Sequence, residues 1–251
     1  MRKVRANDPS GTYRRRIRVV ATEPGVVVSD LEDDYHRFRV TLRHDGTTAL
    51  SLEGESLRFP WSTCPEAAVP LHALDGTPLS VRVTAAAQHT NPRANCTHMF
   101  DLAGLAIAHA TRGIETRQYD VELPARVDRR TQPKLWRDRE LLLAWTIEGR
   151  ELVDPPPYSE VPWRGGFMAW ADEALDPDTA EAAIVLRRAC DIGKGRGIDL
   201  DQFETAEPLA EIMEGVCYTM TRPVIEHAAR NKVSMRDFDD DPDGLLADDD
   251  D

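Results

Sequence analysis

The chain has no long hydrophobic run. No stretch approaches the roughly 20 apolar residues that a helix needs to cross a bilayer. The basic start, Met1–Lys3, is not followed by the apolar stretch of a secretory signal. Cysteine is scarce too, because four cysteines among 251 residues do not make a disulfide framework. These absences predict a soluble, cytoplasmic protein with reduced thiols.

Positive charge is in the minority, with 31 Lys and Arg against 44 Asp and Glu, and a net charge of −13. An acidic chain repels phosphate backbones, so the composition disfavours a nucleic-acid partner, and the lack of a span disfavours a membrane. The oligomeric state stays open. Much of the negative excess lies in Asp239–Asp241 and Asp248–Asp251. Like-charge blocks usually stay solvated, so residues 239–251 are expected to form a disordered acidic tail.

The first sixty residues predict a β-meander. Residues 13–21 are basic and rich in strand formers, and residues 26–28 begin a second strand. Residues 38–43 alternate apolar and polar side chains, the pattern of a half-buried strand. An Asp-Gly turn at residues 45–46 favours a hairpin, and residues 50–59 complete the meander. We interpret the arginines of these strands as lining an outer, solvent-facing surface.

Beyond residue 60 the pattern alternates between helix and strand, and Pro155–Pro157 mark an internal sub-boundary near 154–157. We expect one α+β domain over residues 10–238, with an antiparallel meander sheet packed with helices and additional helices towards the C-terminus. The expected helices are 65–74, 95–113, 167–175, 178–191 and 208–217, and the expected strands are 79–87, 118–123 and 141–147.

Two predicted helix starts carry the candidate chemistry. Cys64 precedes Pro65, so it is expected at the N-cap, where free N–H groups and the helix dipole favour an anion and lower a thiol pKa. Cys96 and His98 place a thiol and an imidazole in the first turn of the next helix. The simpler alternative is that each cysteine is only a small buried residue at a helix start. Cys190, among apolar residues in mid-helix, is expected in the core.

Several kinds of site fit these residues. A Cys–His dyad would use a thiolate as nucleophile and His98 as base, whereas a cofactor-free acid–base site would pair His98 with a carboxylate such as Asp101. A metal site needs about four ligands, and Cys64, Cys96, His98 and Cys217 would supply them for zinc or an iron–sulfur cluster. The spacing does not separate these alternatives.

The segment from Cys64 to His98 resembles the bacterial domain-of-unknown-function family 2889. The matching features are a Cys followed by Leu74-x-Gly76, a Cys-Thr-His helix start, and a later Cys–aromatic pair at Cys217 and Tyr218. The resemblance spans most of residues 10 to 240, with Asn95 and Met99 standing where the family usually has Gly and Leu. It implies a role in bacterial catabolism of aromatic or steroid-like compounds. In its order of elements the chain also resembles iron–sulfur scaffold proteins of the NifU/IscU type, without their full cysteine–aspartate set.

Three hypotheses about function remain from the sequence. The first is a small-molecule catabolic enzyme, a lyase or hydrolase acting on an aromatic, steroid-like or acyl substrate, with Cys96, His98 and Cys64 as catalytic residues and no defined cofactor. The second is a metal- or iron–sulfur-binding module ligated by Cys64, Cys96, His98 and Cys217. The third is a non-catalytic structural or partner-binding protein in which the cysteines only pack.

Overall fold

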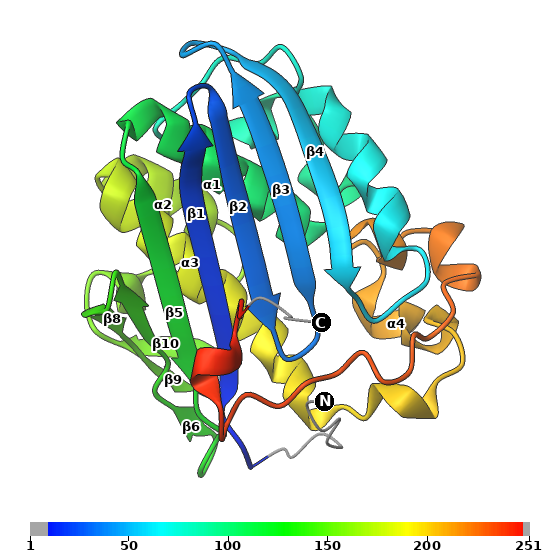
Figure 1. Ribbon diagram of the computed structural model, residues 1–251. Coiled ribbons are helices and arrows are strands. Elements are labelled where there is room, and N and C mark those ends of the chain that lie inside the picture. The colour runs from blue at the N-terminus through cyan, green and yellow to red at the C-terminus, as the bar shows by residue number, and fades with distance from the viewer. Residues whose placement is uncertain (1–9, 248–251) are drawn as a thin grey trace.

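A computed structural model describes residues 10–247 of the chain (Figure 1). Within this range a seven-stranded antiparallel sheet has the order β4-β3-β2-β1-β5-β7-β8, and a smaller sheet has the order β10-β9-β6. Helices cover one face of the large sheet (Figure 1), which confirms the predicted α+β class. The strands are β1 (Tyr13–Glu23), β2 (Val26–Asp33), β3 (Arg37–His44), β4 (Ala49–Arg58), β5 (Thr116–Leu123), β6 (Arg130–Thr131), β7 (Lys134–Arg137), β8 (Glu140–Ala144), β9 (Thr146–Glu148) and β10 (Glu151–Asp154).

Strands β1 to β4 form the expected meander, each pairing antiparallel with the next. Alternate residues of β1 are buried, because successive side chains of a strand point to opposite faces of the sheet. Tyr13, Arg15 and Ile17 therefore share the inner face with the helices. The expectation that the strand arginines all face solvent was wrong for Arg15, whose side chain is only 2% exposed.

The main helices are α1 (Thr97–Arg112), α2 (Phe167–Ala174) and α3 (Pro177–Gly193), close to their predicted bounds. Helix α1 ends at Gly113, whose φ of +64° is the left-handed conformation that glycine adopts most easily. At the start of α3, the side chain of Asp176 accepts hydrogen bonds from the first free backbone amides. Helices α1 and α3 both contact β1, so they pack on the same sheet.

Four predicted elements differ from the structure. The single strand expected at 141–147 breaks at Trp145 into β8, in the large sheet, and β9, in the small sheet. Residues 79–87, expected as a strand, contain no strand and lead into the 3₁₀ helix η2 (Val83–Gln88), because three consecutive alanines favour helical turns over strand pairing. The helix expected at 65–74 is a 3₁₀ helix, η1 (Cys64–Leu74), with Pro70 inside it. Instead of a helix over 208–217, only α4 (Ala210–Met213) is α-helical, and Gly215 turns the chain with φ +75°. The remaining 3₁₀ helices are η3 (Pro92–Ala94), η4 (Tyr158–Glu160), η5 (Lys194–Gly197), η6 (Leu200–Gln202), η7 (Glu207–Leu209), η8 (Tyr218–Met220), η9 (Val224–Glu226) and η10 (Pro242–Gly244).

The segment expected as a disordered acidic tail crosses the outer face of the sheet (Figure 1, red). Arg16 donates to the carbonyl oxygen of Leu245 at 3.1 Å, and Arg18 donates to that of Leu246 at 2.9 Å. Both leucines are buried. The prediction of disorder was therefore wrong for residues 239–247, because β1 supplies guanidinium donors to this segment. Residues 248–251 lie outside the described part of the chain.

One hydrophobic core contains residues from both sides of Pro155–Pro157. Trp145 before the prolines and Phe167 after them pack edge to face, with ring centroids 5.8 Å apart. The core is therefore continuous across the predicted sub-boundary, and the single domain stays a prediction. Within residues 10–247, no helix is both long enough and apolar enough to cross a membrane.

Candidate functional site

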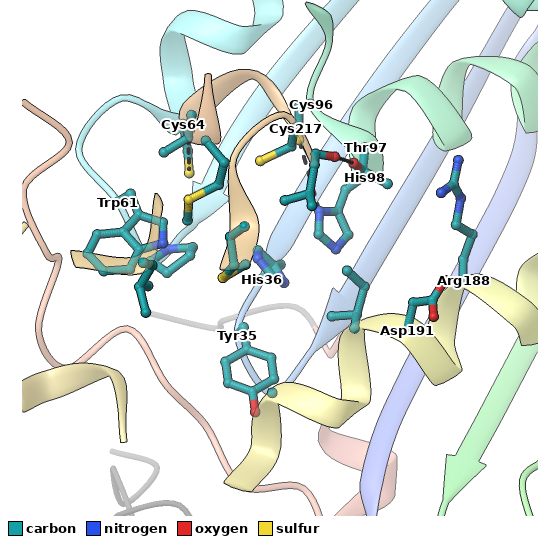
Figure 2. A pocket seen from close by; sticks show the side chains of 18 of the residues that line it. Tyr35, His36, Trp61, Cys64, Cys96, Thr97, His98, Arg188, Asp191 and Cys217 are labelled. Carbon is teal, nitrogen blue, oxygen red and sulfur yellow. Dashed lines mark hydrogen bonds between the residues drawn. The ribbon is translucent and has the colours of Figure 1, made fainter. Parts of the chain in front are cut away.

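A cavity of about 750 Å³ lies beside the β2–β3 hairpin, at the start of α1 and the end of α3. Segments between residues 198 and 220 complete its wall. In Figure 2 the rings of His36 and His98 lie together near the centre, with Cys64, Cys96 and Cys217 above them. The cavity thus gathers side chains from distant parts of the sequence around two imidazoles.

Asp33, at the end of β2, is the most heavily hydrogen-bonded carboxylate of the site. Its Oδ1 accepts from the amides of Tyr35 and His36, both at 2.8 Å, and lies 3.0 Å from His36 Nδ1. Its Oδ2 accepts from the Tyr13 hydroxyl at 2.7 Å and from Arg15 Nη2 at 2.6 Å. Burial alone would raise the pKa of Asp33, but His36 and Arg15 hold it well below its usual range. Asp33 is therefore a buried carboxylate anion.

The charge of Asp33 fixes the tautomer of His36. An ionised carboxylate only accepts hydrogen bonds, so Nδ1 of His36 must carry the proton that it shares with Asp33. Burial lowers the pKa of His36 although Asp33 favours its charged form. His36 is thus neutral at pH 7, with a lone pair on Nε2, and it lines the cavity.

Arg15 fixes the tautomer of His98 in the same way. Arg15 Nη2 lies 3.2 Å from His98 Nε2, and a guanidinium only donates, so Nε2 accepts and Nδ1 carries the proton. Burial, together with the nearby His36 and Arg15, lowers the pKa of His98 well below its usual range. The Nδ1 atom lies 4.0 Å from the sulfur of Cys96. The site thus holds two neutral imidazoles, 4.0 Å apart between ring centroids, each with its proton on Nδ1.

Asp33, His36 and His98 form a group that suits a metal ion in residue type, with ligand atoms all within 4.8 Å of one another. It is the one such group of three or more in the described part of the chain. However, Arg15 Nη2 contacts both Asp33 Oδ2 and His98 Nε2. A cation already lies between two of the three ligand atoms and would repel a second one. With Arg15 in place, the residues fit a metal ion poorly.

The cysteines predicted as site residues, Cys64, Cys96 and Cys217, all line this cavity together with His98. Burial raises the pKa of Cys64 and of Cys96, and it raises the pKa of Cys217 to about 12. This is opposite to the lowering expected at a helix start, because loss of water outweighs the weak field of the helix end. None of these sulfurs belongs to a group of three or more ligand atoms within 4.8 Å among the described residues. Their role as metal ligands stays a prediction.

Cationic side chains dominate the polar wall on the α3 side of the cavity. The guanidinium of Arg187 stacks on Trp163 at 4.0 Å from the ring centroid. Burial lowers the pKa of the neighbouring Lys194 to about 8, and its ammonium lies 2.8 Å from Asp191 Oδ1. The cationic residues that line the cavity are Arg93, Arg164, Arg187, Arg188 and Lys194, and the acidic ones are Asp191 and Glu214. Cationic side chains therefore outnumber acidic ones in the lining of the cavity.

The glycine-rich residues 193–197 supply Lys194 and Gly195 to the cavity wall and include η5. One sequence interpretation changes in this region. Asp101, considered as the carboxylate partner of His98, pairs instead with Arg188, with 3.0 Å between Oδ2 and Nε. Cys190 is buried in α3, as expected, and is not among the cavity residues.

Four residues of the site were missed from the sequence: Tyr13, Arg15, Asp33 and His36. A signal was present in both places. In β1 the period-2 pattern places Arg15 on the same face as Tyr13 and Ile17. Between two predicted strands, Asp33 and His36 have the spacing of an Asp that accepts from the amides of its own turn.

Neither the known protein families nor the curated proteins compared include a match to this chain. The resemblances to family 2889 and to iron–sulfur scaffold proteins therefore stay predictions.

Proposed function

We propose that the protein is an enzyme that uses cofactor-free acid–base chemistry on a small anion with an apolar body. The observation that carries this proposal is the Asp33–His36 pair, with Oδ1 3.0 Å from Nδ1, facing a cavity large enough for a small molecule. Such a carboxylate–imidazole pair orients the ring and stabilises the imidazolium that forms when the ring takes a proton.

The two imidazoles then divide the chemistry. His36 Nε2 removes a proton from a substrate carbon or from a water molecule. His98 Nδ1–H donates a hydrogen bond to the oxygen on which negative charge develops, as in the sites that stabilise an oxyanion. Arg15 keeps His98 in the tautomer that can donate. Removal of a proton from a substrate carbon would begin a lyase reaction, and removal of a proton from water would begin a hydrolase reaction.

The cavity wall indicates the class of substrate. Its apolar part includes Phe100, Ile192 and Met213, which suit an aromatic or acyl body. Its cationic part suits a carboxylate, because an anion loses less on leaving water when fixed positive charge surrounds it. This keeps the aromatic, steroid-like or acyl substrate class, but assigns Cys64 and Cys96 to the wall rather than to nucleophilic attack.

The catalytic roles are tested with a panel of small aromatic and acyl carboxylates and their esters. His36→Gln and Asp33→Asn should each lower turnover by about 10²-fold or more, the size of a typical general-base contribution. The matched control is His72→Gln, because His72 Nδ1 also lies 3.1 Å from a carboxylate, that of Asp75, but on the exposed surface. Equal turnover in His36→Gln and wild type would refute the proposal.

A second test needs no substrate. In ¹H–¹⁵N correlation spectra at neutral pH, both His36 and His98 should show the neutral Nδ1–H tautomer, which is the minor form of free histidine. A charged ring, or a proton on Nε2 of His36, would contradict the proposal. Substitution Arg15→Met should release the tautomer of His98 while that of His36 stays unchanged.

A metal-binding function is the second candidate, supported by the spacing of Asp33, His36 and His98. Elemental analysis of protein purified without chelators distinguishes the two. We expect less than one tenth of an equivalent of zinc or iron, because Arg15 lies between the ligand atoms. One equivalent that is lost in both His36→Ala and His98→Ala would replace the acid–base proposal by a metal centre.

A further inference from the structure

The segment that carries Cys217 runs against the start of α1. The amide of Tyr218 donates to the carbonyl oxygen of Asn95 at 3.0 Å. On the other side, the hydroxyl of Thr97 donates to the carbonyl oxygen of Val216 at 2.9 Å. The residues between these two hydrogen bonds are Cys96 and Cys217.

This arrangement resembles the non-hydrogen-bonded pair of an antiparallel ladder, with the Thr97 hydroxyl in place of its amide. Residues at such a pair face each other, with Cα atoms about 4.5 Å apart in a regular ladder. Both cysteines have extended backbone, with φ −65° and ψ 122° at Cys96 and φ −159° and ψ 174° at Cys217. Disulfides join Cα atoms about 4.4–6.8 Å apart, so the backbone geometry suits a bond between these residues.

Both side chains also border the same cavity (Figure 2). Cys217 is partly exposed whereas Cys96 is buried, so Cys217 is the more accessible residue of the two. Cys217 and Cys64 both raise the pKa of Cys96, so the pair is selected by the backbone geometry and not by this electrostatic effect. Cys64 has a different partner, since its sulfur lies 3.6 Å from the hydroxyl of Thr219.

We propose that Cys96 and Cys217 form an oxidation site that closes to a disulfide when a hydroperoxide enters the cavity. The Cys217 sulfur attacks the peroxide as its thiol gives up a proton, and the O–O bond breaks. The proton and the departing hydroxide form one water, and a sulfenic acid remains on Cys217. The raised pKa of this thiol makes the step slow. The Cys96 sulfur then displaces hydroxide from the sulfenic sulfur, and with a proton this leaves as a second water. The two thiols together lose two protons and two electrons, and one hydrogen peroxide is reduced to two waters.

The disulfide would connect the wall segment at Cys217 to the start of α1, beside His98. It would also remove the thiol that His98 Nδ1 approaches at 4.0 Å. Any effect on turnover rests on the acid–base proposal above, whereas formation of the bond does not. The bond is therefore tested by chemistry alone.

The experiment treats the reduced full chain with hydrogen peroxide, blocks remaining thiols with iodoacetamide, and maps the peptides by mass spectrometry. We expect one cross-linked pair, Cys96 with Cys217, that dithiothreitol reverses, while Cys64 and Cys190 are alkylated once the protein is unfolded. The control Cys190→Ser should keep the cross-link. Cys96→Ser should lose it and instead leave a sulfenic acid at Cys217 that dimedone traps.

Some results would overturn the proposal. A cross-link that joins Cys64 to either cysteine, or one that forms equally fast in urea, would show that the folded arrangement does not select the pair. Four alkylatable thiols after peroxide treatment would show that no disulfide forms. These outcomes are read on the wild-type protein, so they do not depend on whether the serine variants fold.

Discussion

The carboxylate of Asp33 binds Arg15 and His36 directly, and it acts on His98 through Arg15. Replacing it with Asn keeps the shape but removes the charge that Arg15 and His36 face. Because this leaves a buried guanidinium without its anion, we expect Asp33→Asn to lower the free energy of unfolding by about 3–5 kcal/mol. The comparison is Asp30→Asn, which breaks the more exposed pair with Arg39 and should cost less than about 1 kcal/mol. Urea denaturation at pH 7 measures both, and equal losses would mean that the buried pair has no special role.

His98 makes stability depend on pH, with a sign that follows from its lowered pKa. Burial keeps the ring neutral when folded, whereas the unfolded chain takes up a proton below the ordinary value of 6.5. The contribution of His98 to the free energy of unfolding is complete above pH 6.5. It is lost as the pH falls below that value, by about 1.4 kcal/mol per pH unit, until the folded state also takes up the proton. We therefore expect stability to fall less steeply from pH 6.5 to 5 in His98→Gln than in wild type. Parallel curves would show that the folded state protonates His98 as readily as the unfolded chain.

The candidate site could be predicted from the sequence only in part, for a physical reason at each residue. Cys64, Cys96, His98 and Cys217 come to one cavity, as the sequence suggested, because they begin elements that meet at one end of the sheet. Arg15 was predicted to face solvent, because a buried arginine needs a buried anion as its partner. That partner, Asp33, lies 18 positions away along the chain and on the neighbouring strand. Local sequence does not contain that partner.

At the scale of elements, close packing of α1 depends on Gly104. A Cβ placed there would lie 2.4 Å from the carbonyl oxygen of Val83. Because this oxygen is a backbone atom, a change of side-chain rotamer cannot relieve the clash. We expect Gly104→Ala to lower the free energy of unfolding by about 1–3 kcal/mol, although alanine favours helix. At Gly197 an added Cβ meets nothing within 4 Å, so Gly197→Ala is the control and should stay within about 0.5 kcal/mol of wild type. Thermal denaturation compares the two, and an unaffected Gly104→Ala would show that η2 moves freely.

The helices and strands with a clear sequence pattern were the part of the fold that the sequence could predict. Strands β1 to β5 were predicted from strand-forming residues or from alternation, as at residues 38–43, and all of them are present, as are helices α1 to α3. The failures at residues 79–87 and 208–217 have short or mixed patterns. At residues 79–87, three consecutive alanines favour helical turns over a strand, and in 208–217 Gly215 turns the chain with φ +75°.

For the whole molecule, the outer face of β1 is tied to the segment around Leu246. The amide of Leu246 donates to Glu32 Oε2 at 2.8 Å, and its side chain is only 4% exposed. We expect Leu246→Ala to lower the free energy of unfolding by about 2–4 kcal/mol, as for other buried leucines. Leu50→Ala is the control, because Leu50 is 55% exposed, and it should have little effect. Equal melting temperatures in the two variants would show that the segment contributes nothing to the fold.

The contact between β1 and this segment also has a consequence for biosynthesis. Arg16 and Leu245 are hydrogen-bonded but separated by 229 positions in the chain. At about 5–20 residues per second, a ribosome needs on the order of ten seconds or more to supply the second partner after the first. Throughout that time Arg16 and Arg18 lack the carbonyl oxygens of Leu245 and Leu246, so this part of the outer face stays uncovered until those residues are made.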